Sequence, residues 1–312
     1  MGKNKTRKEK KAAQDELTSM EELNATMLTH ARQIARKIGA SAVLVYVDVI
    51  KSREQLSTLL KERRCILAAR YQEVIDDLSE MEGVEDRIIK VPYINLTRQS
   101  QVKVAAMLAL SQDLIKQGDR IVCLCGSPNY EIFDSLTVMD IGREFEIFSS
   151  KDLDITSKMD KPHVFDRLLT LTLELAEEGK EGKPLGTIFI LGDDKKVMEL
   201  SSQMVINPFS GVPEAERNIM DSGLKETLRE FASIDGAFVI RDDGVILAAG
   251  RHLKASTEDE ELPQGLGARH RAAAGITALT DAIAIVISES TGGVRIFNQG
   301  KMFMEIEKAG KE

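Results

Sequence analysis

Asp235-Gly236-Ala237 and, further along the chain, Gly265-Leu266-Gly267-Ala268-Arg269-His270-Arg271 are the stretches that decide how this sequence is read. The first is a small-residue turn with a carboxylate, which can hold a metal ion or accept a proton. In the second, glycines before a helix let the backbone approach an anion, and the helix start offers unpaired N–H groups. Its arginines are suited to phosphate. Together the two stretches predict nucleotidyl transfer.

Each stretch alone has a plainer interpretation. A Gly-x-Gly sequence before a helix can be an ordinary helix start with surface arginines. Asp235 can be a simple turn residue, because aspartate is common in turns. Arg269 and Arg271 are two positions apart and diverge on a regular helix, so both reach one phosphate chain only if the first helical turn is itself the site.

Two further segments follow expected strands. Ser288-Glu289-Ser290-Thr291-Gly292-Gly293 comes at the end of an apolar run, and ligand sites gather at strand ends in α/β sheets. His252-Leu253 follows a strand that ends at Ala249-Gly250, and a histidine ring beside a leucine can cover a purine. The alternatives are a tight polar turn for the first segment and an exposed loop histidine for the second.

Composition narrows the class of protein. The 312 residues are 43% hydrophobic, which is ordinary for a globular protein of two domains. Aromatic residues are only 4% and tryptophan is absent, so few side chains can stack on bases as in a single-strand binding groove. The net charge of -8 argues against a broad nucleic-acid surface.

Cysteines and apolar runs bear on location. Cys65, Cys123 and Cys125 have no zinc or redox spacing, and we expect buried thiols in a reducing compartment. No apolar run spans a bilayer and no signal peptide precedes the chain, so we expect a cytoplasmic protein with no integral membrane segment.

The N-terminal half predicts an α/β domain with a mostly parallel sheet, because helical and strand patterns alternate. Residues 1–18 are expected to form a basic flexible tail, and 19–150 the domain. Helices are expected at 19–38 and 97–116, the first capped by Ser19 with Glu22. Strands are expected at 41–49, 64–69, 87–91, 120–125 and 135–141.

The C-terminal half predicts a second α/β domain with a mixed sheet, placed at 158–306 after a charged junction. Its hairpin turns at Asp242-Asp243-Gly244, a strong turn signal. Helices are expected at 164–179, 222–231 and 269–279, and strands at 186–191, 236–240, 245–249, 282–287 and 294–297.

These elements, in this order, resemble the diadenylate cyclase domain. The family's two hallmark motifs are Asp-Gly-Ala and Arg-His-Arg, and both stand intact here, at 235–237 and 269–271. The strand–turn–strand after Ala237, Leu266-Gly267 and the Ser-Glu turn agree. The likeness covers roughly 161–304, and the two motifs together at this separation are specific.

The resemblance implies condensation of two ATP into cyclic di-AMP with release of two pyrophosphates. Each domain would bind one ATP and offer half a site, so a facing homodimer or higher homo-oligomer is implied, with Mn²⁺ or Mg²⁺. Asp235 would hold the metal and activate the 3′-hydroxyl, and Arg269, His270 and Arg271 would hold phosphates, with His270 near the metal. The remaining implied ATP contacts are Gly236, Ala237, Gly250, His252, Leu253, Gly265, Leu266, Gly267, Ala268, Ser288 and Glu289.

The N-terminal half is similar to the C-terminal α/β domain of pyruvate kinase, found on one branch of this family. Residues 42–48, 101–112 and 118–126 carry that likeness. The domain could be a metabolite-responsive or assembly module. The loop Ser127-Pro128-Asn129 is a candidate pocket there, with a plain turn as the alternative.

One residue departs from the family pattern. Many members carry threonine where this chain has Ala268, so a hydroxyl contact to phosphate is lost. The alternative function is therefore a catalytically weak sensor of nucleotide or cyclic di-AMP, whose N-terminal domain controls assembly. The chain ends soon after Met304, without room for the helix–hairpin–helix tail of another branch, and we expect no DNA partner.

Overall fold

The structure is a computed structural model that describes residues 2–50, 56, 59, 64–127, 131–142, 161–254 and 267–309, with backbone alone for 2–18 and 85. The chain divides into two compact units. The N-terminal unit comprises Met1–Val91, Gln101–Ala109 and Asp113–Ile141, and the C-terminal unit comprises the rest. In the described part of the chain, no helix combines the length and the apolar character needed to cross a membrane.

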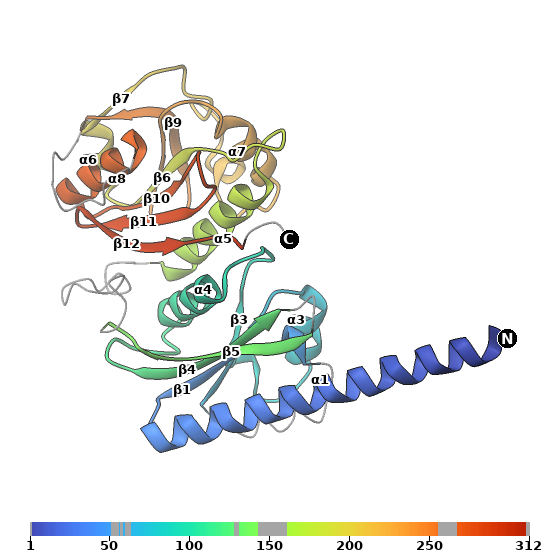
Figure 1. The fold of residues 1–312 in the computed structure, drawn as a ribbon. Helices are drawn as coiled ribbons and strands as arrows, with labels where there is room; N and C mark the ends of the chain where they lie inside the picture. Colours follow the sequence, from blue (N-terminus) through green and yellow to red (C-terminus); the bar gives the residue numbers. More distant parts are fainter. Residues whose placement is uncertain are drawn as a thin grey trace. The chain divides into compact units, whose positions relative to one another are not determined.

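The N-terminal unit is built on a five-stranded sheet in the order β3-β2-β1-β4-β5 (Figure 1). Four neighbouring strands are parallel and β5 is an antiparallel edge strand. β1 and β2 are buried along their whole length, as expected for apolar runs covered on both faces. The strands are β1 Ala42–Tyr46, β2 Cys65–Ala69, β3 Ile88–Lys90, β4 Arg120–Ser127 and β5 Ile132–Asp140. The expected mostly parallel sheet is confirmed.

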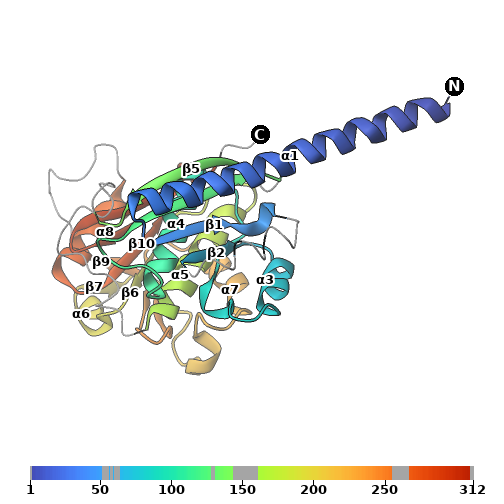
Figure 2. The same cartoon turned by 90° about the horizontal axis from the view of Figure 1, so that it is seen from below.

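Helices cover both faces of this sheet. α1 (Gly2–Ile38) and α3 (Gln72–Ser79) share one core with alternate residues of the strands. On the opposite face α4 (Arg98–Ser111) accepts, at the Gln101 carbonyl oxygen, a 2.7 Å hydrogen bond from the Tyr46 hydroxyl. Figure 2, seen from below, shows α1 in front of this sheet and running alongside β5.

The structure corrects the expected start of the first helix. α1 runs from Gly2, so the helix begins well before the expected start at Ser19. The segment 2–18 is rich in lysine and also contains alanine, glutamate, glutamine and arginine, all of which have high helix propensity. The expected stop at Gly39 is confirmed. Gly39 has φ +66°, and the Ala40 N–H bonds the Ala35 carbonyl at 2.8 Å, which closes the helix in a Schellman motif.

The C-terminal unit contains a seven-stranded mixed sheet in the order β12-β11-β10-β6-β8-β9-β7. Only β6 and β8 run parallel, and the other neighbours are antiparallel. Its strands are β6 Thr187–Leu191, β7 Ser201–Gln203, β8 Ala237–Ile240, β9 Ile246–Leu253, β10 Ile283–Ile287, β11 Val294–Asn298 and β12 Lys301–Ile306. The expected mixed sheet is confirmed.

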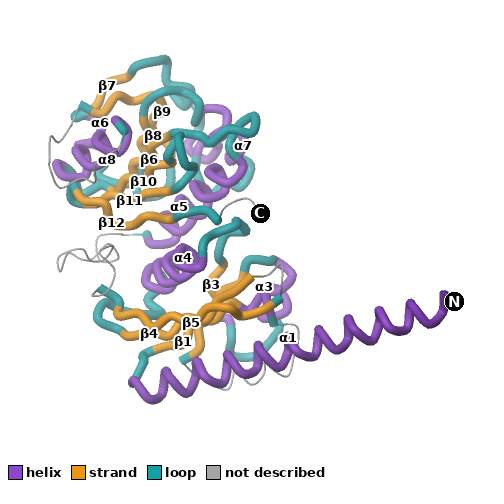
Figure 3. Tube along the Cα trace, viewed as in Figure 1, coloured by secondary structure: helices purple, strands orange, loops and turns teal. Residues whose placement is uncertain are grey.

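Among the described residues of this unit, α-helices flank the sheet (Figures 1 and 3). They are α5 Pro162–Glu178, α6 Asp194–Glu199, α7 Leu224–Phe231 and α8 Ala268–Leu279. Ala273 and Ala274 of α8 pack with Ile188 on one face of the sheet. Side chains alternate across a strand, and on the other face a chain of aromatic contacts through Phe189, Phe238, Phe209 and Phe231 leads to α7.

The β8–β9 hairpin follows its sequence signal. Gly244 has φ +91°, and its N–H bonds the Arg241 carbonyl at 2.8 Å. The sequence missed the short elements α3 and β7 and the edge strand β12, because short patterns carry little periodicity. The helix start expected at Asp193-Asp194 is confirmed as the beginning of α6. Short 3₁₀ turns lie at Val47–Val49, Glu85–Arg87 and Glu214–Arg217.

A buried amide joins α1 to the loop before β5, and its removal should destabilise the N-terminal unit. Asn24 is 5% exposed; its amide donates to the Glu131 carbonyl at 2.8 Å, and its oxygen accepts the Phe133 N–H at 2.8 Å. We expect Asn24→Ala to lower the free energy of unfolding by about 1–3 kcal/mol, because a buried N–H and a carbonyl lose their partner. Urea denaturation measures this, with the exposed Thr26→Ala on the same helix as the control. Equal stability of both variants would contradict it.

Candidate active site

Asp235 lies between α7 and the start of β8, with its side chain 75% exposed. Gly236 follows with φ +106°, a conformation that favours glycine. A Cβ atom on Gly236 would lie 2.7 Å from the Gly250 carbonyl carbon, so the two strands approach closely there. Ala237 is buried and pairs with Ile188 of β6. The sheet therefore fixes the backbone that carries the carboxylate.

Arg269 stands in the first turn of α8, directly opposite this carboxylate. Its guanidinium Nη2 lies 3.6 Å from Asp235 Oδ1, and its Nη1 donates to Glu289 Oε2 at 2.7 Å. Glu289 belongs to the turn after β10, and its side chain is 68% exposed. Three segments far apart in the sequence thus place one cation between two carboxylates.

Gly186, just before β6, provides the space for this arrangement. A Cβ atom there would lie 2.6 Å from Glu289 Cβ and 2.9 Å from Arg269 Nη1. Any side chain would therefore displace the ion pair. Gly186 is not among the site residues expected from sequence. Glycine is required at this position only because the start of α8 and the β10–β11 turn come together next to it.

A cavity of about 360 Å³ opens beside Asp235 and Arg269. It joins β6, the end of β9 and the start of α8. Its described lining residues are Ile188, Met204, Asp235, Gly236, Arg251, His252, Leu253, Ala268, Arg269, Arg271 and Ala272. The volume is within the range of small-molecule sites. Seven of the fifteen site residues expected from sequence line it: Asp235, Gly236, His252, Leu253, Ala268, Arg269 and Arg271.

Arg251 is a lining residue that the sequence did not reveal. It is 9% exposed, and its guanidinium donates to the Met198 carbonyl at 2.7 Å, the Ser201 carbonyl at 2.9 Å and the Ser201 hydroxyl at 2.8 Å. Burial lowers the pKa of the Arg251 guanidinium. These bonds tie the end of α6 to β7 and β9, so Arg251 fixes its part of the cavity wall.

His270 lies apart from the other motif residues. It is 6% exposed, and its Nε2 lies 3.0 Å from Arg295 Nη1, while Arg295 in turn donates to Glu305 at 2.7 Å. It is not among the residues lining the cavity. Burial, reinforced by Arg295, lowers the pKa of His270 to about 4, so the ring is neutral near pH 7. In the structure His270 is thus a buried ring that anchors α8 to β11, whereas the sequence predicted a contact with phosphate or metal.

The other expected residues divide into three groups. Ser288 is 4% exposed, and its hydroxyl lies 3.1 Å from that of Ser290, within the turn that presents Glu289. Gly250 has φ +70° and accepts the Met204 N–H at 3.0 Å, and Gly267 is the N-cap of α8. Gly265 and Leu266 lie outside the described residues.

Two protein families match this chain, one in its C-terminal half and one in its N-terminal half. The family described as "DisA bacterial checkpoint controller nucleotide-binding" matches residues 174–302, and the family described as "probable sensor domain DacZ_P" matches 23–148. The first range contains Asp235, Arg269 and the cavity.

Relatives extend over nearly the whole chain. A diadenylate cyclase of Methanocaldococcus jannaschii is 30% identical over 90% of this chain and 96% of its own length. One from Haloferax volcanii is 36% identical over 71% of this chain and 80% of its own, and the cyclic di-AMP synthase CdaA of Bacillus subtilis is 42% identical over 25% of this chain and 28% of its own.

The fold and the site therefore define a nucleotidyltransferase with a nucleotide-binding domain at its C-terminal end. The chain belongs to the diadenylate cyclase family. The likeness of the N-terminal unit to pyruvate kinase stays a prediction, and so do the domain boundaries at 18/19, 150 and 158.

Adding one methyl group at Gly186 should uncouple the ion pair without unfolding the protein. We expect Gly186→Ala to lower the rate of cyclic di-AMP formation at least about tenfold, because a small displacement of positioned groups is costly in rate. Overpacking should lower the free energy of unfolding by about 1–3 kcal/mol. A product assay with thermal unfolding measures both effects. Gly223→Ala is the matched control, because its Cβ would meet only Asp221 at 3.4 Å; equal activity in both variants would rule out this role.

The buried His270 should make stability depend on pH. Its pKa falls from 6.5 to about 4 on folding. Between these two pH values the unfolded chain binds a proton at His270 and the folded chain does not. Stability is fully present above pH 6.5 and declines as the pH falls toward 4. We expect the drop in unfolding free energy between pH 7 and pH 5 to be about 2 kcal/mol smaller in His270→Gln than in the natural protein. Urea denaturation at both pH values checks this, with exposed His30→Gln as the control.

Proposed function

We propose that each C-terminal unit binds one ATP in the cavity and that two copies, facing each other, condense two ATP into cyclic di-AMP and two pyrophosphates. The observation that supports this most directly is the position of Arg269 between Asp235 and Glu289 at the cavity wall. Arg269 can bind a phosphate and Asp235 can accept a proton, and a single ligand in the cavity can contact both side chains.

The proposed orientation of ATP follows from the cavity lining. Arg269 and Arg271, at the start of α8, hold the phosphates, and the positive end of the helix dipole faces them. His252, exposed on β9, packs on the adenine, and the Leu253 backbone reads its edge. Gly236 and Ala237 lie beneath the nucleotide, where the lack of a larger side chain permits close approach.

A second copy is part of the proposal because one nucleotide cannot close the ring. Cyclic di-AMP has two phosphodiester bonds, and each forms when the 3′-oxygen of one ATP attacks the α-phosphorus of the other. The bond from that phosphorus to the β-phosphate oxygen breaks, pyrophosphate leaves, and the 3′-hydroxyl proton passes to a base. Asp235 is the proposed base, and its 75% exposed side chain leaves it open to a nucleotide held by a facing copy.

The acidic residues also fit a divalent ion. Carboxylate oxygens suit Mg²⁺ and Mn²⁺, and Mg²⁺ binds through one or two carboxylates with substrate phosphates completing its shell. Asp235 and Glu289 supply two such groups, while the described residues hold no cluster of three or more potential ligands. The proposed metal residues are therefore Asp235 and Glu289, without His270. When bound, the ion neutralises charge on the reacting phosphates.

Ala268 supports a second candidate function. It lines the cavity and offers no hydroxyl to a phosphate, which fits a sensor that binds nucleotide with little turnover. Arg269, Asp235 and Glu289 remain, however. Only one neutral hydrogen bond to phosphate is lost, which is worth about 1 kcal/mol. The cyclase is therefore the preferred function.

Removing the proposed base should abolish the reaction. With ATP and Mg²⁺ or Mn²⁺, we expect mass spectrometry to detect cyclic di-AMP from the natural protein and at least about a hundredfold less from Asp235→Asn, since a positioned base contributes about that much. Glu199→Gln, which neutralises an exposed acid on α6, is the control and should be fully active.

The same assay tests the facing pair. The rate per chain should fall on dilution as the assembly dissociates, which sedimentation can follow in parallel. A constant rate per chain under conditions where the protein is monomeric would exclude the two-copy mechanism. Tight ATP binding with no product under either metal would favour the sensor.

A further inference from the structure

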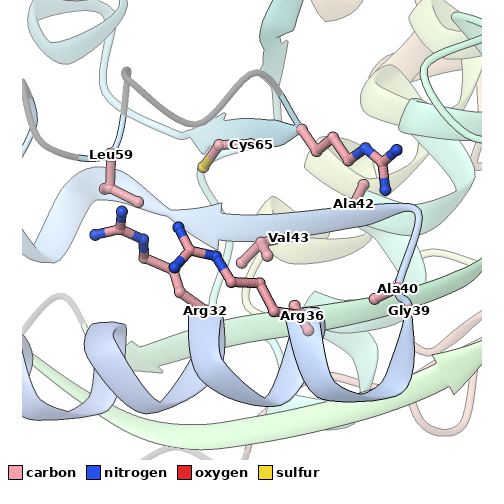
Figure 4. A pocket seen from close by; sticks show the side chains of 10 residues that line it. Arg32, Arg36, Gly39, Ala40, Ala42, Val43, Leu59 and Cys65 are labelled. Carbon is pink, nitrogen blue, oxygen red and sulfur yellow. The ribbon is translucent and has the colours of Figure 1, made fainter.

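Arginines line a cavity in each unit, but in different settings. In the N-terminal unit a cavity of about 250 Å³ lies beside the last turns of α1, with Arg32 and Arg36 on its wall (Figure 4). Both side chains also interact with other groups of the protein, so this cavity alone does not identify a ligand. In the C-terminal unit the buried Arg251 has defined hydrogen bonds, and these bear on how the catalytic cavity binds its nucleotide.

Arg251 stands where three strands of the catalytic unit meet. It lies on β9, and its backbone is paired with β8 at Ala237 and with β7 at Gln203. The two residues after it end the strand and line the cavity, namely His252 and Leu253. The segment that is proposed to contact adenine therefore begins directly at Arg251.

The side chain of Arg251 ties the end of β9 to the edge of the sheet. Its Nε donates to the Ser201 hydroxyl at 3.0 Å, and its Nη2 donates to the carbonyls of Met198 and Ser201 at 2.7 and 2.9 Å. The Ser201 hydroxyl in turn donates to the Val197 carbonyl at 2.7 Å. One guanidinium group thus holds together the end of α6, the start of β7 and the end of β9.

The elements at this edge of the sheet are short. β7 has three residues and α6 has six, so each contributes few backbone hydrogen bonds. Hydrogen bonds from a charged donor are stronger than neutral ones, and Arg251 is 9% exposed, so water competes little for them. We therefore expect loss of the guanidinium to loosen β7 and the end of β9 before the rest of the sheet.

The phosphate end of the cavity is held by different contacts. Arg269 bonds Glu289 and lies beside Asp235, and neither pair involves β7 or α6. The backbone of Arg251 itself stays paired with β8. A displacement of the end of β9 therefore reaches the proposed adenine contacts and leaves the phosphate contacts in place.

We propose that Arg251 is a positioning residue for the adenine base, which fixes the end of β9 where His252 and Leu253 meet the nucleotide. This inference rests on the proposed orientation of ATP in the cavity. The alternative is a direct contact with phosphate, because Arg251 Nη1 has only a 3.5 Å contact with Gln203 Oε1 and could turn to a ligand. The two roles differ in whether recognition of the base is lost.

Isothermal titration calorimetry of the full chain separates these roles. The probes are analogues of ATP and GTP with a methylene bridge between the α- and β-phosphorus atoms, which cannot release pyrophosphate. A site that pairs with the edge of adenine leaves polar groups unpaired when guanine enters, so the natural protein should prefer the ATP analogue. We expect Arg251→Met to weaken the ATP analogue about tenfold or more and the GTP analogue less than about threefold.

Milder variants and steady-state kinetics extend the test. Arg251→Lys keeps the charge without the paired donors and should restore part of the preference for adenine. Ser201→Ala should lower the preference less than Arg251→Met does, and combined with Arg251→Met it should cause no further loss, since both act through the same contacts. In the cyclase assay Arg251→Met should raise KM for ATP and leave kcat within about threefold, because the phosphate contacts are retained.

Arg217→Met is the matched control. Arg217 also ties a loop to β9, donating to the carbonyls of Val212 and Ile246 at 2.8 and 2.6 Å, and it is not among the described residues that line the cavity. It should lose stability and keep the preference for adenine. Circular dichroism checks the fold of each variant; if Arg251→Met is unfolded, Arg251→Lys and Ser201→Ala decide in the same way.

Equal weakening of both analogues in Arg251→Met would identify a phosphate contact and overturn the proposal. An unchanged preference for adenine in that variant, or an equal loss of preference in Arg217→Met, would also overturn it. If the natural protein binds neither analogue, the proposed function itself fails and this inference fails with it.

Discussion

The ion bridge from Asp235 through Arg269 to Glu289 is the interaction on which the catalytic unit depends. It joins the loop before β8, the first turn of α8 and the turn after β10. All three groups are partly exposed, so the bridge itself contributes little to stability. Its importance is positional, because it fixes the charges that a nucleotide would meet.

Close packing of small residues makes that position possible. Gly186 leaves room beneath the bridge, and Gly236 lets β8 pass close to Gly250 of β9. After the first turn of α8, the small side chains of Ala273 and Ala274 pack against the sheet and let the helix lie close to it. The reactive groups are thus held on a rigid backbone and leave a cavity beside them, as a site that works mainly by positioning and charge requires.

Arg269 lies in a negatively charged setting, because one guanidinium group stands between two carboxylates. The three groups of the bridge together carry one negative charge. Such an arrangement suits chemistry in which charge develops during the reaction.

By itself the sequence determined the two α/β units, the mixed and the mostly parallel sheet, and the hairpin at Gly244, because these follow from local periodicity and turn chemistry. It also predicted Asp235 and Arg269 as site residues from two contiguous motifs, and the structure places their side chains 3.6 Å apart. Tertiary structure alone decided how the residues next to these motifs are oriented and what they contact. It turned His270 inward to Arg295, placed Arg251 in the cavity wall, and made glycine necessary at residue 186. These roles depend on contacts between segments distant in the chain, and no local pattern records which segments will meet.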